Sequence, residues 1–422
     1  MKRGIVLAGG GSRGPYEIGV WQALRELEIS FDIVTGTSVG ALNGALMVQG
    51  SFEQAKALWQ SISSADVISG LPAESTMHDP RLYASFLRKA VEQGGMDTTP
   101  LEETLRRIID EDAFRQSPIE YALVTVEYPS FRPVNLTKEQ IPQGKLVDYL
   151  LASSACFPAF RQREIDGSRF IDGSYYDVMP VNLAVECGAE EIIAVDLHSL
   201  GLHPQVKAGY PITIIQSHWD LGIFLVFDPA IARRNMVLGY QDAMKAFRRL
   251  EGKAYTFFPG ETARNALVLS HTVHSMRRRF RELLLNEASS PSRDLALYRL
   301  RKALSLTDKQ KYGRLMTQAA ETAGEIFQLD PARSYSFGEF NRCLLTAVKD
   351  RTTSISAMPK LVSISELLPL AARETTLWLL DALRQAYHSG SVPPRFWRRA
   401  AVSTKESVAA LYLFILELSR GI

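Results

Sequence analysis

A serine stands between two glycines in the segment Gly36-Thr37-Ser38-Val39-Gly40, directly after a short apolar run. This G-x-S-x-G pattern is typical of a nucleophilic serine at a sharp strand-to-helix turn, where glycines let neighbouring backbone approach closely. The helix that follows would direct its free N–H groups and partial positive charge toward the serine. The pattern therefore predicts Ser38 as a nucleophile, in an elbow formed with Gly36, Thr37, Val39 and Gly40.

A glycine-rich loop precedes this serine at the end of the previous predicted strand, and its sequence Gly9-Gly10-Gly11-Ser12-Arg13-Gly14 fits the dinucleotide template G-x-G-x-x-G. A dinucleotide site also needs an acidic residue at the end of the second strand. That strand ends in Val34-Thr35, and Asp32 lies near its start. We therefore interpret the loop as donating backbone N–H groups to an oxyanion beside Ser38. A dinucleotide-binding oxidoreductase is the alternative, and it would bind NAD and tolerate Ser38→Ala.

The predicted nucleophile needs a proton acceptor, and none of the seven histidines lies in a segment that looks organised around it. The segment Arg169-Phe170-Ile171-Asp172-Gly173-Ser174 is different, because a short apolar strand ends there in an aspartate. Burial raises the pKa of such a carboxylate toward the working range of a general base. We predict Asp172 as the base. A triad of Ser38, Asp172 and His198 is the alternative, in the chain order of the common α/β-hydrolases.

In this order, the glycine loop, the G-x-S-x-G turn and the Asp172-Gly173 pair resemble the patatin-like phospholipases, lipid acyl hydrolases with a Ser–Asp dyad. The flanking residues 152–158, 179–181 and 187–189 are also similar to that family. The resemblance covers about residues 1–200 and fades by about residue 260. It implies that Ser38 is the nucleophile, Asp172 the base and the glycine loop the oxyanion hole. Ser174 departs from the usual Gly or Ala and would donate a hydrogen bond that lowers the basicity of Asp172.

Short β-branched runs alternate with helical periodicity up to about residue 260, which is typical of a sheet covered on both faces. We expect a three-layer α/β/α, patatin-like domain over residues 1–260, with a mostly parallel sheet. The predicted strands are 4–8, 31–35, 121–127, 169–172, 192–197, 212–216 and 254–258, and the predicted helices are 15–27, 41–48, 101–109 and 181–187. For the third helix we expect Thr99 as N-cap, Pro100 as first residue and Glu102 completing a capping box.

Residues 261–422 lose the strand signal and carry four capping boxes, which begin at Thr307, Ser336, Ser363 and Ser403. We therefore expect a mainly helical C-terminal region. Lid, regulatory element and oligomer contact all fit this region, and neither its role nor the oligomeric state follows from the sequence.

Bulk composition limits the partners and the compartment. Of 422 residues, 46% are hydrophobic and 22% charged, as in ordinary globular proteins, and the net charge of +2 gives no general attraction for nucleic acid. The three cysteines, Cys156, Cys187 and Cys343, lie far apart, which fits a reducing compartment. No apolar run approaches the ~20 residues of a membrane span. We expect a cytoplasmic protein without cofactor or metal, because the histidines show no ligand spacing.

Two basic stretches, residues 277–281 and 393–399, combine arginine with apolar or aromatic side chains. They fit a solvated helix face and a loop packed on the core; peripheral contact with anionic lipid head groups is the alternative. Arg13 has two open roles as well, in which it either binds a head-group phosphate or braces its own loop.

The residues predict ester cleavage through an acyl-serine intermediate, and the resemblance implies a lipid acyl hydrolase of phospholipase A or lysophospholipase type, which acts on a phospholipid or other lipid ester. An acyltransferase or thioesterase with the same dyad differs only in the acyl acceptor or the substrate. A non-catalytic scaffold would also keep the fold. The head group, the sn-position, the acyl length and the origin of the lipid do not follow from the sequence.

Overall fold

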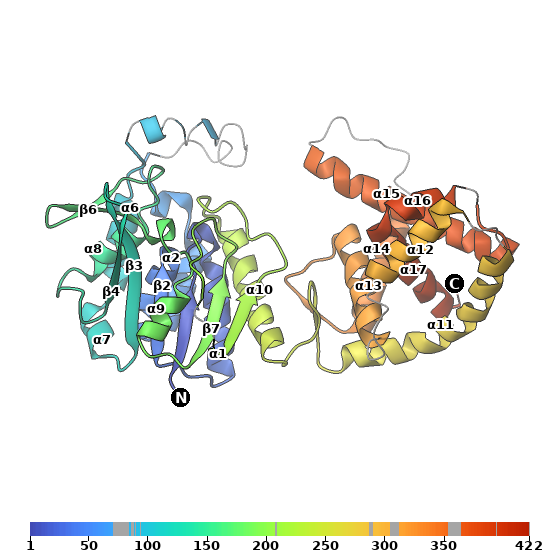
Figure 1. Ribbon diagram of the computed structural model, residues 1–422, viewed down its shortest axis with the longest axis horizontal. Helices are drawn as coiled ribbons and strands as arrows, with labels where there is room; N and C mark the ends of the chain where they lie inside the picture. The colour runs from blue at the N-terminus through green and yellow to red at the C-terminus, as the bar shows by residue number, and fades with distance from the viewer. Residues whose placement is uncertain are drawn as a thin grey trace. The chain divides into compact units, whose positions relative to one another are not determined.

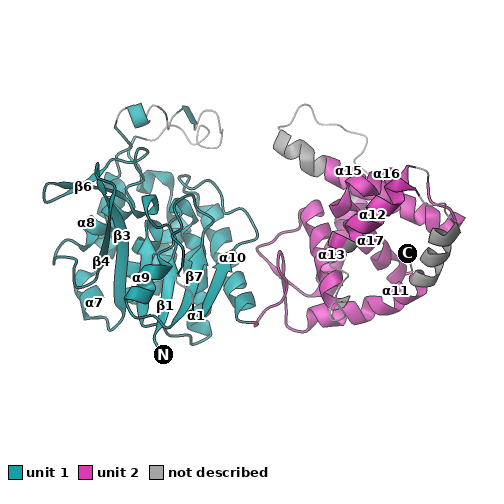
Figure 2. Ribbon diagram, viewed as in Figure 1, with its two compact units in different colours: residues 1–247 teal, residues 248–422 magenta. Residues whose placement is uncertain are grey.

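The computed structural model describes the chain except for residues 71–83, 86–87, 89, 93, 207–208, 287–289, 304–311, 353–363, 394 and 422. The chain divides into two compact units, Met1–Phe247 and Arg248–Ile422 (Figure 2). The boundary between the two units therefore lies at residues 247 and 248, somewhat before the boundary at residue 260 that the sequence predicts.

A mixed sheet of eight strands runs through the described part of the first unit (Figure 1). Its strands are β1 (Arg3–Leu7), β2 (Ile33–Thr37), β3 (Glu120–Tyr128), β4 (Arg132–Thr137), β5 (Arg163–Ile165), β6 (Ser168–Asp172), β7 (Glu191–Asp196) and β8 (Ile212–Gln216). The order is β5-β6-β3-β2-β1-β7-β8, and β4 also pairs with β3. The pairs within β3-β2-β1-β7-β8 are parallel, whereas β4, β5 and β6 make antiparallel pairs.

Helices cover both faces of this sheet. They are α1 (Pro15–Glu26), α2 (Val39–Val48), α3 (Phe52–Ser61), α6 (Thr99–Ile108), α7 (Glu111–Gln116), α8 (Leu146–Ser153), α9 (Val181–Glu186) and α10 (Pro229–Ala246). Successive side chains of a strand point to opposite faces. In β1, Val6 packs against α9, whereas its neighbour Leu7 faces Gly44 of α2. The two helices therefore lie on opposite faces, and the predicted three-layer α/β/α fold is confirmed (Figure 1).

The sequence does not predict helices α3, α7, α8 and α10, and the element predictions differ from the structure in further places of this unit. Strand β2 begins and ends two residues later than expected and so includes Gly36. Strands β4 and β5 were not predicted, because β4 lies at an edge with mostly half-buried and exposed residues and β5 has three residues. Thr99 is not the N-cap of α6: it is the first helical residue, and its N–H and hydroxyl donate to the Asp97 carboxylate. Glu102 accepts from Arg106 and Arg163 instead of closing a capping box.

Strands β2 and β6 meet end to end along one edge of β3. Strand β4 occupies the other edge of β3 over residues 122–127, so β2 and β6 must share the remaining one. Along that edge, Thr37 at the end of β2 lies opposite Val124, and Asp172 at the end of β6 lies opposite Thr125. Strand β2 runs parallel to β3 and β6 runs antiparallel to it. Their carboxyl ends therefore point at each other and bring residues far apart in sequence together.

The second unit consists of helices and one short two-stranded sheet. Its described elements are β9 (Thr256–Phe257), α11 (Glu261–Asn286), α12 (Pro291–Ala303), α13 (Tyr312–Phe327), β10 (Ser334–Tyr335), α14 (Phe337–Thr352), α15 (Ile364–Ser389), α16 (Phe396–Val402) and α17 (Thr404–Ser419). The predicted strand 254–258 survives as β9, but it pairs with β10 and not with the large sheet. The reason is aromatic packing, since Phe257 stacks on Phe337 with ring centroids 4.0 Å apart.

Two of the four predicted capping boxes can be compared with the structure. Ser336 accepts a hydrogen bond from the Glu339 amide at 3.2 Å, at the start of α14. Ser403 is the N-cap residue of α17 but makes no side-chain cap bond. The boxes that begin at Thr307 and Ser363 lie outside the described residues.

Candidate active site

Ser38 sits at a tight turn between β2 and α2. Its backbone is in the left-handed region, with φ of 56°, which is rare for a residue other than glycine. A Cβ atom on Gly36 would lie 2.4 Å from the Gly40 carbonyl oxygen, and one on Gly40 would lie 2.3 Å from the Leu7 carbonyl oxygen. Only glycine fits at both positions. The elbow is thus a steric consequence of the G-x-S-x-G sequence.

A second serine holds this elbow against β3. The Ser38 amide donates to Ser153 Oγ at 2.9 Å, and Ser153 Oγ donates to the Val124 carbonyl at 2.7 Å. Val124 lies where the carboxyl ends of β2 and β6 meet, so Ser153 bridges the junction of the two strands. No role for Ser153 follows from the sequence. It lies at the end of an apolar helix, and nothing local marks it as a support for a distant turn.

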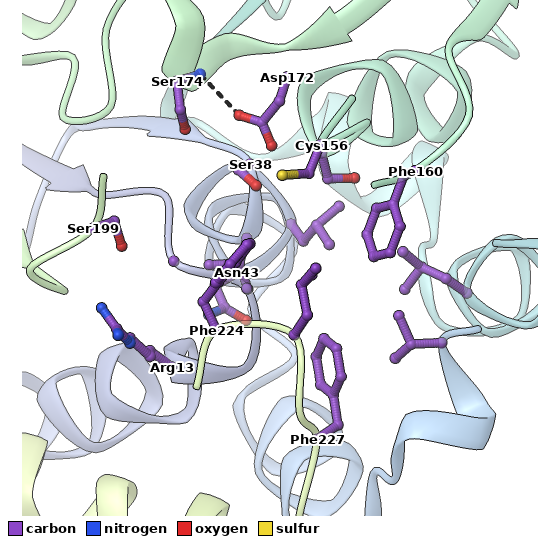
Figure 3. Close-up of a pocket in the computed structure, with 18 of the residues that line it drawn as sticks. Arg13, Ser38, Asn43, Cys156, Phe160, Asp172, Ser174, Ser199, Phe224 and Phe227 are labelled. Atoms are coloured by element: carbon purple, nitrogen blue, oxygen red, sulfur yellow. Dashed lines mark hydrogen bonds between the residues drawn. The ribbon is translucent and has the colours of Figure 1, made fainter. Parts of the chain in front are cut away.

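Asp172 lies beside Ser38 at the end of β6 (Figure 3). Its side chain is buried, and Oδ1 accepts a hydrogen bond from the Ser174 amide at 2.8 Å. Burial raises the pKa of this carboxyl above its usual range; the Ser174 amide and the hydroxyls of Ser38 and Ser174 act in the opposite direction. Ser174 therefore stabilises the carboxylate as the sequence suggested, but burial is the larger effect. Gly173 is required by space, since its Cβ would lie 2.2 Å from the Val124 carbonyl oxygen.

The glycine loop forms a single 3-10 turn over Gly11–Arg13 next to the elbow. Four of its six amides already donate to carbonyl oxygens: Gly9 to Val178, Ser12 to Phe224, Arg13 to Gly10 and Gly14 to Gly11. Within the described residues, the amides of Gly10 and Gly11 donate to no protein group. These two residues also line the cavity that contains Ser38. Only these two amides of the predicted loop are therefore available to an oxyanion.

A second loop, residues 221–227, lies over the glycine loop. The Ser12 hydroxyl donates to the Ile223 carbonyl at 2.8 Å. A Cβ on Gly11, which has φ of 55°, would lie 2.1 Å from the Phe224 carbonyl oxygen. Arg13 donates to the carbonyls of Leu197, His198 and Gly222, so its side chain braces the surrounding loops. Of the two roles considered for Arg13, this geometry supports bracing.

His198 has other partners than Asp172. Its Nε2 lies 2.9 Å from the Ser217 carbonyl oxygen, and its Nδ1 lies 3.8 Å from a carboxylate oxygen of Asp196. The groups that shift the pKa of Asp172 include no histidine. The structure therefore does not place the His198 imidazole between the Asp172 carboxylate and Ser38, as a triad would require.

An apolar cavity of about 800 Å³ opens beside Ser38 and Asp172 (Figure 3). It extends between α2, α3 and α6 and under the loop 221–227. Its wall is formed mostly by large apolar side chains, namely Leu42, Leu46, Leu58, Trp59, Ile62, Val67, Leu101, Leu105, Ile108, Phe160, Phe224, Leu225 and Phe227. These residues come from distant segments, so no sequence pattern announces the cavity.

Two further ionisable groups lie close to the site. Burial and the nearby Asp172 charge raise the pKa of the Cys156 thiol to about 12, so the thiol is neutral. Burial also raises the pKa of Asp177 to about 6, while the Asp177 carbonyl accepts a hydrogen bond from Thr37. Nothing in the sequence around Asp177 indicates that its side chain is buried.

Three further points from the sequence concern metal ligands, membrane spans and the basic stretch 277–281. In the described residues, no group of three or more His, Cys, Asp or Glu side chains is arranged to hold a metal ion. Nor does the described part of the chain contain a helix long and apolar enough to cross a membrane. The side chains of residues 277–281 lie outside the described part of the chain, so a solvated helix face stays the prediction for them and lipid contact the alternative.

The site thus joins a hydroxyl on a strained turn, a buried carboxylate and two unengaged amides at one end of an apolar cavity. This arrangement suits acyl transfer through a serine. The family model for the patatin-like phospholipases matches residues 5–185. The first unit therefore contains a patatin-like phospholipase domain, and the resemblance seen in the sequence is confirmed.

Curated relatives agree with this assignment at low identity. An uncharacterised NTE family protein of Mycobacterium tuberculosis is 26% identical over 194 residues, which cover 46% of this chain and 48% of the relative. Lysophospholipase nte1 of Aspergillus terreus is 27% identical over 212 residues, and human patatin-like phospholipase domain-containing protein 6 is 27% identical over 201 residues. The matches span only 12% and 13% of those two proteins.

Two solved structures cover most of the chain with low similarity. VipD of Legionella pneumophila aligns at a TM-score of 0.36 with 11% identity, over 97% of this chain and 91% of VipD. The type III effector ExoU aligns at 0.33 with 12% identity, over 91% of this chain and 80% of ExoU. The family assignment thus depends on the family model and the curated relatives.

Proposed function

We propose that the chain is a lipid acyl hydrolase of phospholipase A or lysophospholipase type, with Ser38 as nucleophile and Asp172 as general base. The observation that carries this proposal is the end-to-end meeting of β2 and β6, which sets a buried carboxylate beside the strained serine. The patatin-like phospholipase domain and the lysophospholipase among the relatives support the substrate class.

In the first half of the reaction, Ser38 Oγ attacks the ester carbonyl carbon while its proton passes to the Asp172 carboxylate. The carbonyl oxygen becomes an oxyanion that accepts hydrogen bonds from the amides of Gly10 and Gly11. Each such donor typically stabilises the transition state by about 2.7–4 kcal/mol. The tetrahedral intermediate collapses when the ester C–O bond breaks, and the departing alcohol takes the proton from Asp172. The acyl group stays on Ser38.

In the second half, water attacks the acyl-serine carbonyl and gives its proton to Asp172. The same amides hold the second oxyanion. Breaking the Ser38 ester bond returns the proton to Oγ and releases the fatty acid. Burial suits Asp172 to this cycle, because a raised pKa makes its carboxylate a better proton acceptor than that of an ordinary aspartate.

The apolar cavity provides room for an acyl chain, and its far end can be tested. Leu46 lies two helical turns beyond Ser38 on α2 and lines the cavity. Leu46→Phe should lower kcat/KM for a palmitate ester at least about tenfold and leave a butyrate ester nearly unchanged, because the added ring shortens the cavity. The measurement compares nitrophenyl esters of both acids. Leu238→Phe, a buried site outside the cavity wall, is the matched control. Equal loss on both esters would argue against an acyl-chain cavity.

Contact with a lipid surface belongs to the same proposal. Leu200 and Phe224 line the cavity yet are 95% and 38% exposed, and Leu202 and Ile223 beside them are also exposed. Such side chains can enter a bilayer interface. We expect the chain to float with phosphatidylcholine vesicles, and Leu200→Glu combined with Ile223→Glu to reduce the bound fraction. Unchanged flotation of the double variant would reject this surface.

Product analysis decides between hydrolysis and its rivals. The chain is incubated with phosphatidylcholine, lysophosphatidylcholine and an acyl thioester, each with and without glycerol, and the products are identified by mass spectrometry. Free fatty acid from the oxygen esters supports the proposal. Acyl-glycerol as the main product would identify an acyltransferase, and release from the thioester alone would identify a thioesterase.

A further inference from the structure

One buried amide connects three elements around the site. Asn43 of α2 is 1% exposed, and its Nδ2 donates to the Gly14 carbonyl at 3.1 Å and to Glu17 Oε2 at 2.8 Å. Its Oδ1 accepts from the Trp59 indole N–H at 2.9 Å. Both N–H groups of the amide are therefore used, and they reach the end of the glycine loop and helix α1. The carbonyl side reaches α3, whose Trp59 forms part of the cavity wall.

Glu17 supports this amide as a neutral acid. Its side chain is buried, Oε2 accepts from Asn43, and Oε1 has no hydrogen-bond partner among the described residues. A carboxylate without a cationic partner is very unfavourable in such a place. Burial accordingly raises the pKa of Glu17 well above its usual range, against the smaller effect of Asn43. Among the described residues, the side chain of Asn43 is thus the only hydrogen-bond partner of this carboxyl group.

The glycine loop and α2 pack with no free space where Asn43 joins them. A Cβ on Gly14 would lie 2.5 Å from Val39 Cγ2, 2.7 Å from the Trp59 ring and 3.1 Å from Asn43 Nδ2. Gly14 follows the two unengaged amides by a few residues, and Val39 follows Ser38 directly. A change at Asn43 therefore acts on the spacing between the oxyanion donors and the nucleophile.

We propose that Asn43, supported by Glu17 and Trp59, is a positioning residue that fixes the glycine loop relative to Ser38. Asn43 takes no part in bond making; it keeps the amides of Gly10 and Gly11 at the place where the oxyanion forms. The catalytic consequence depends on the hydrolase function proposed above. A displacement of about 1 Å between reacting groups costs roughly 100-fold in rate.

The test is Asn43→Leu, which keeps the side-chain volume and removes all three hydrogen bonds. We expect kcat for a short ester to fall by about 100-fold with KM nearly unchanged, because leucine keeps the volume of the Asn43 side chain, which itself lines the cavity. Hydrogen exchange of the peptide that covers residues 9–14, followed by mass spectrometry, should become faster than in the parent. This second readout does not depend on activity.

Gln49→Met is the matched control. Gln49 is an amide at the other end of α2, where it bonds Ser51 Oγ, the Ile108 carbonyl and the Asp110 amide. Gln49→Met removes as many hydrogen bonds as Asn43→Leu does, but Gln49 lies far from the glycine loop along the helix. We expect its thermal midpoint to fall in a similar way, while kcat and exchange over residues 9–14 stay close to those of the parent.

Glu17 allows a conservative rescue. Glu17→Gln keeps a neutral acceptor for Asn43 and should retain kcat within about twofold, whereas Glu17→Leu leaves Asn43 Nδ2 without that acceptor and should lower kcat about tenfold. Equal losses in these two variants, parallel losses in Asn43→Leu and Gln49→Met, or unchanged exchange over residues 9–14 would each overturn the proposal. If the parent cleaves no ester, the proposed function fails, while the exchange measurement still decides whether Asn43 holds the loop.

Discussion

Ser38→Ala is expected to abolish ester hydrolysis, with a loss of about 10⁶-fold in kcat, the scale seen when a hydrolase loses its nucleophilic serine. Alanine cannot form the acyl-enzyme, and only the oxyanion donors and the cavity would remain. The fold should persist, because the Ser38 side chain is not a structural support: the amide of this residue, not the hydroxyl, bonds to Ser153.

The intact mass of the chain after treatment with a fluorophosphonate probe measures this directly. The parent should gain one adduct and Ser38→Ala none. Ser61→Ala, on the exposed end of α3, controls for other serines and should label like the parent. An adduct on Ser38→Ala would assign the nucleophile to another residue, and a parent that stays unlabelled would contradict the proposed function.

The sequence predicts the elbow well because its physics is mostly local. Gly36 is needed within the turn itself, where a Cβ would meet the Gly40 carbonyl oxygen, whereas Gly40 is needed because β1 passes beside it at Leu7. The pairing of Ser38 with Asp172 is different. Their order in the chain suggested a dyad by resemblance, yet their meeting depends on β4 occupying one edge of β3 and leaving the other to β2 and β6. Strand β4 is an edge strand without a clear apolar pattern, so this register could not be derived from the sequence.

The oxyanion loop shows the limit of motif reasoning more sharply. All six residues from Gly9 to Gly14 fit the predicted oxyanion hole by sequence, but some of their amides donate to carbonyl oxygens far away in the chain. Val178 binds the amide of Gly9, and Phe224 binds that of Ser12. These partners lie in loops without regular periodicity, more than one element away in the chain. The burial of Glu17 and Asn43 does not follow from the sequence for a related reason, since glutamate and asparagine are mostly exposed in folded proteins.

Asp172→Asn should reduce kcat/KM by about 10⁴-fold, the upper end of general acid–base contributions, because asparagine cannot take the Ser38 proton. The change is nearly isosteric, and the asparagine Oδ1 can still accept from the Ser174 amide, so stability should be kept. Probe labelling should slow by a similar factor. His198→Ala is the discriminating comparison, since a loss as large as that of Ser38→Ala would restore the triad alternative.

The pH profile tests the same assignment without removing the group. The base works only when ionised, so kcat/KM should rise with pH through the pKa of Asp172 and then level off. Because burial raises that pKa, the midpoint should lie above the usual aspartate range. The acidic limb should disappear in Asp172→Asn, whose residual rate has no carboxyl group left to titrate at this position. A limb that persists unchanged in that variant would place the titrating base at another residue.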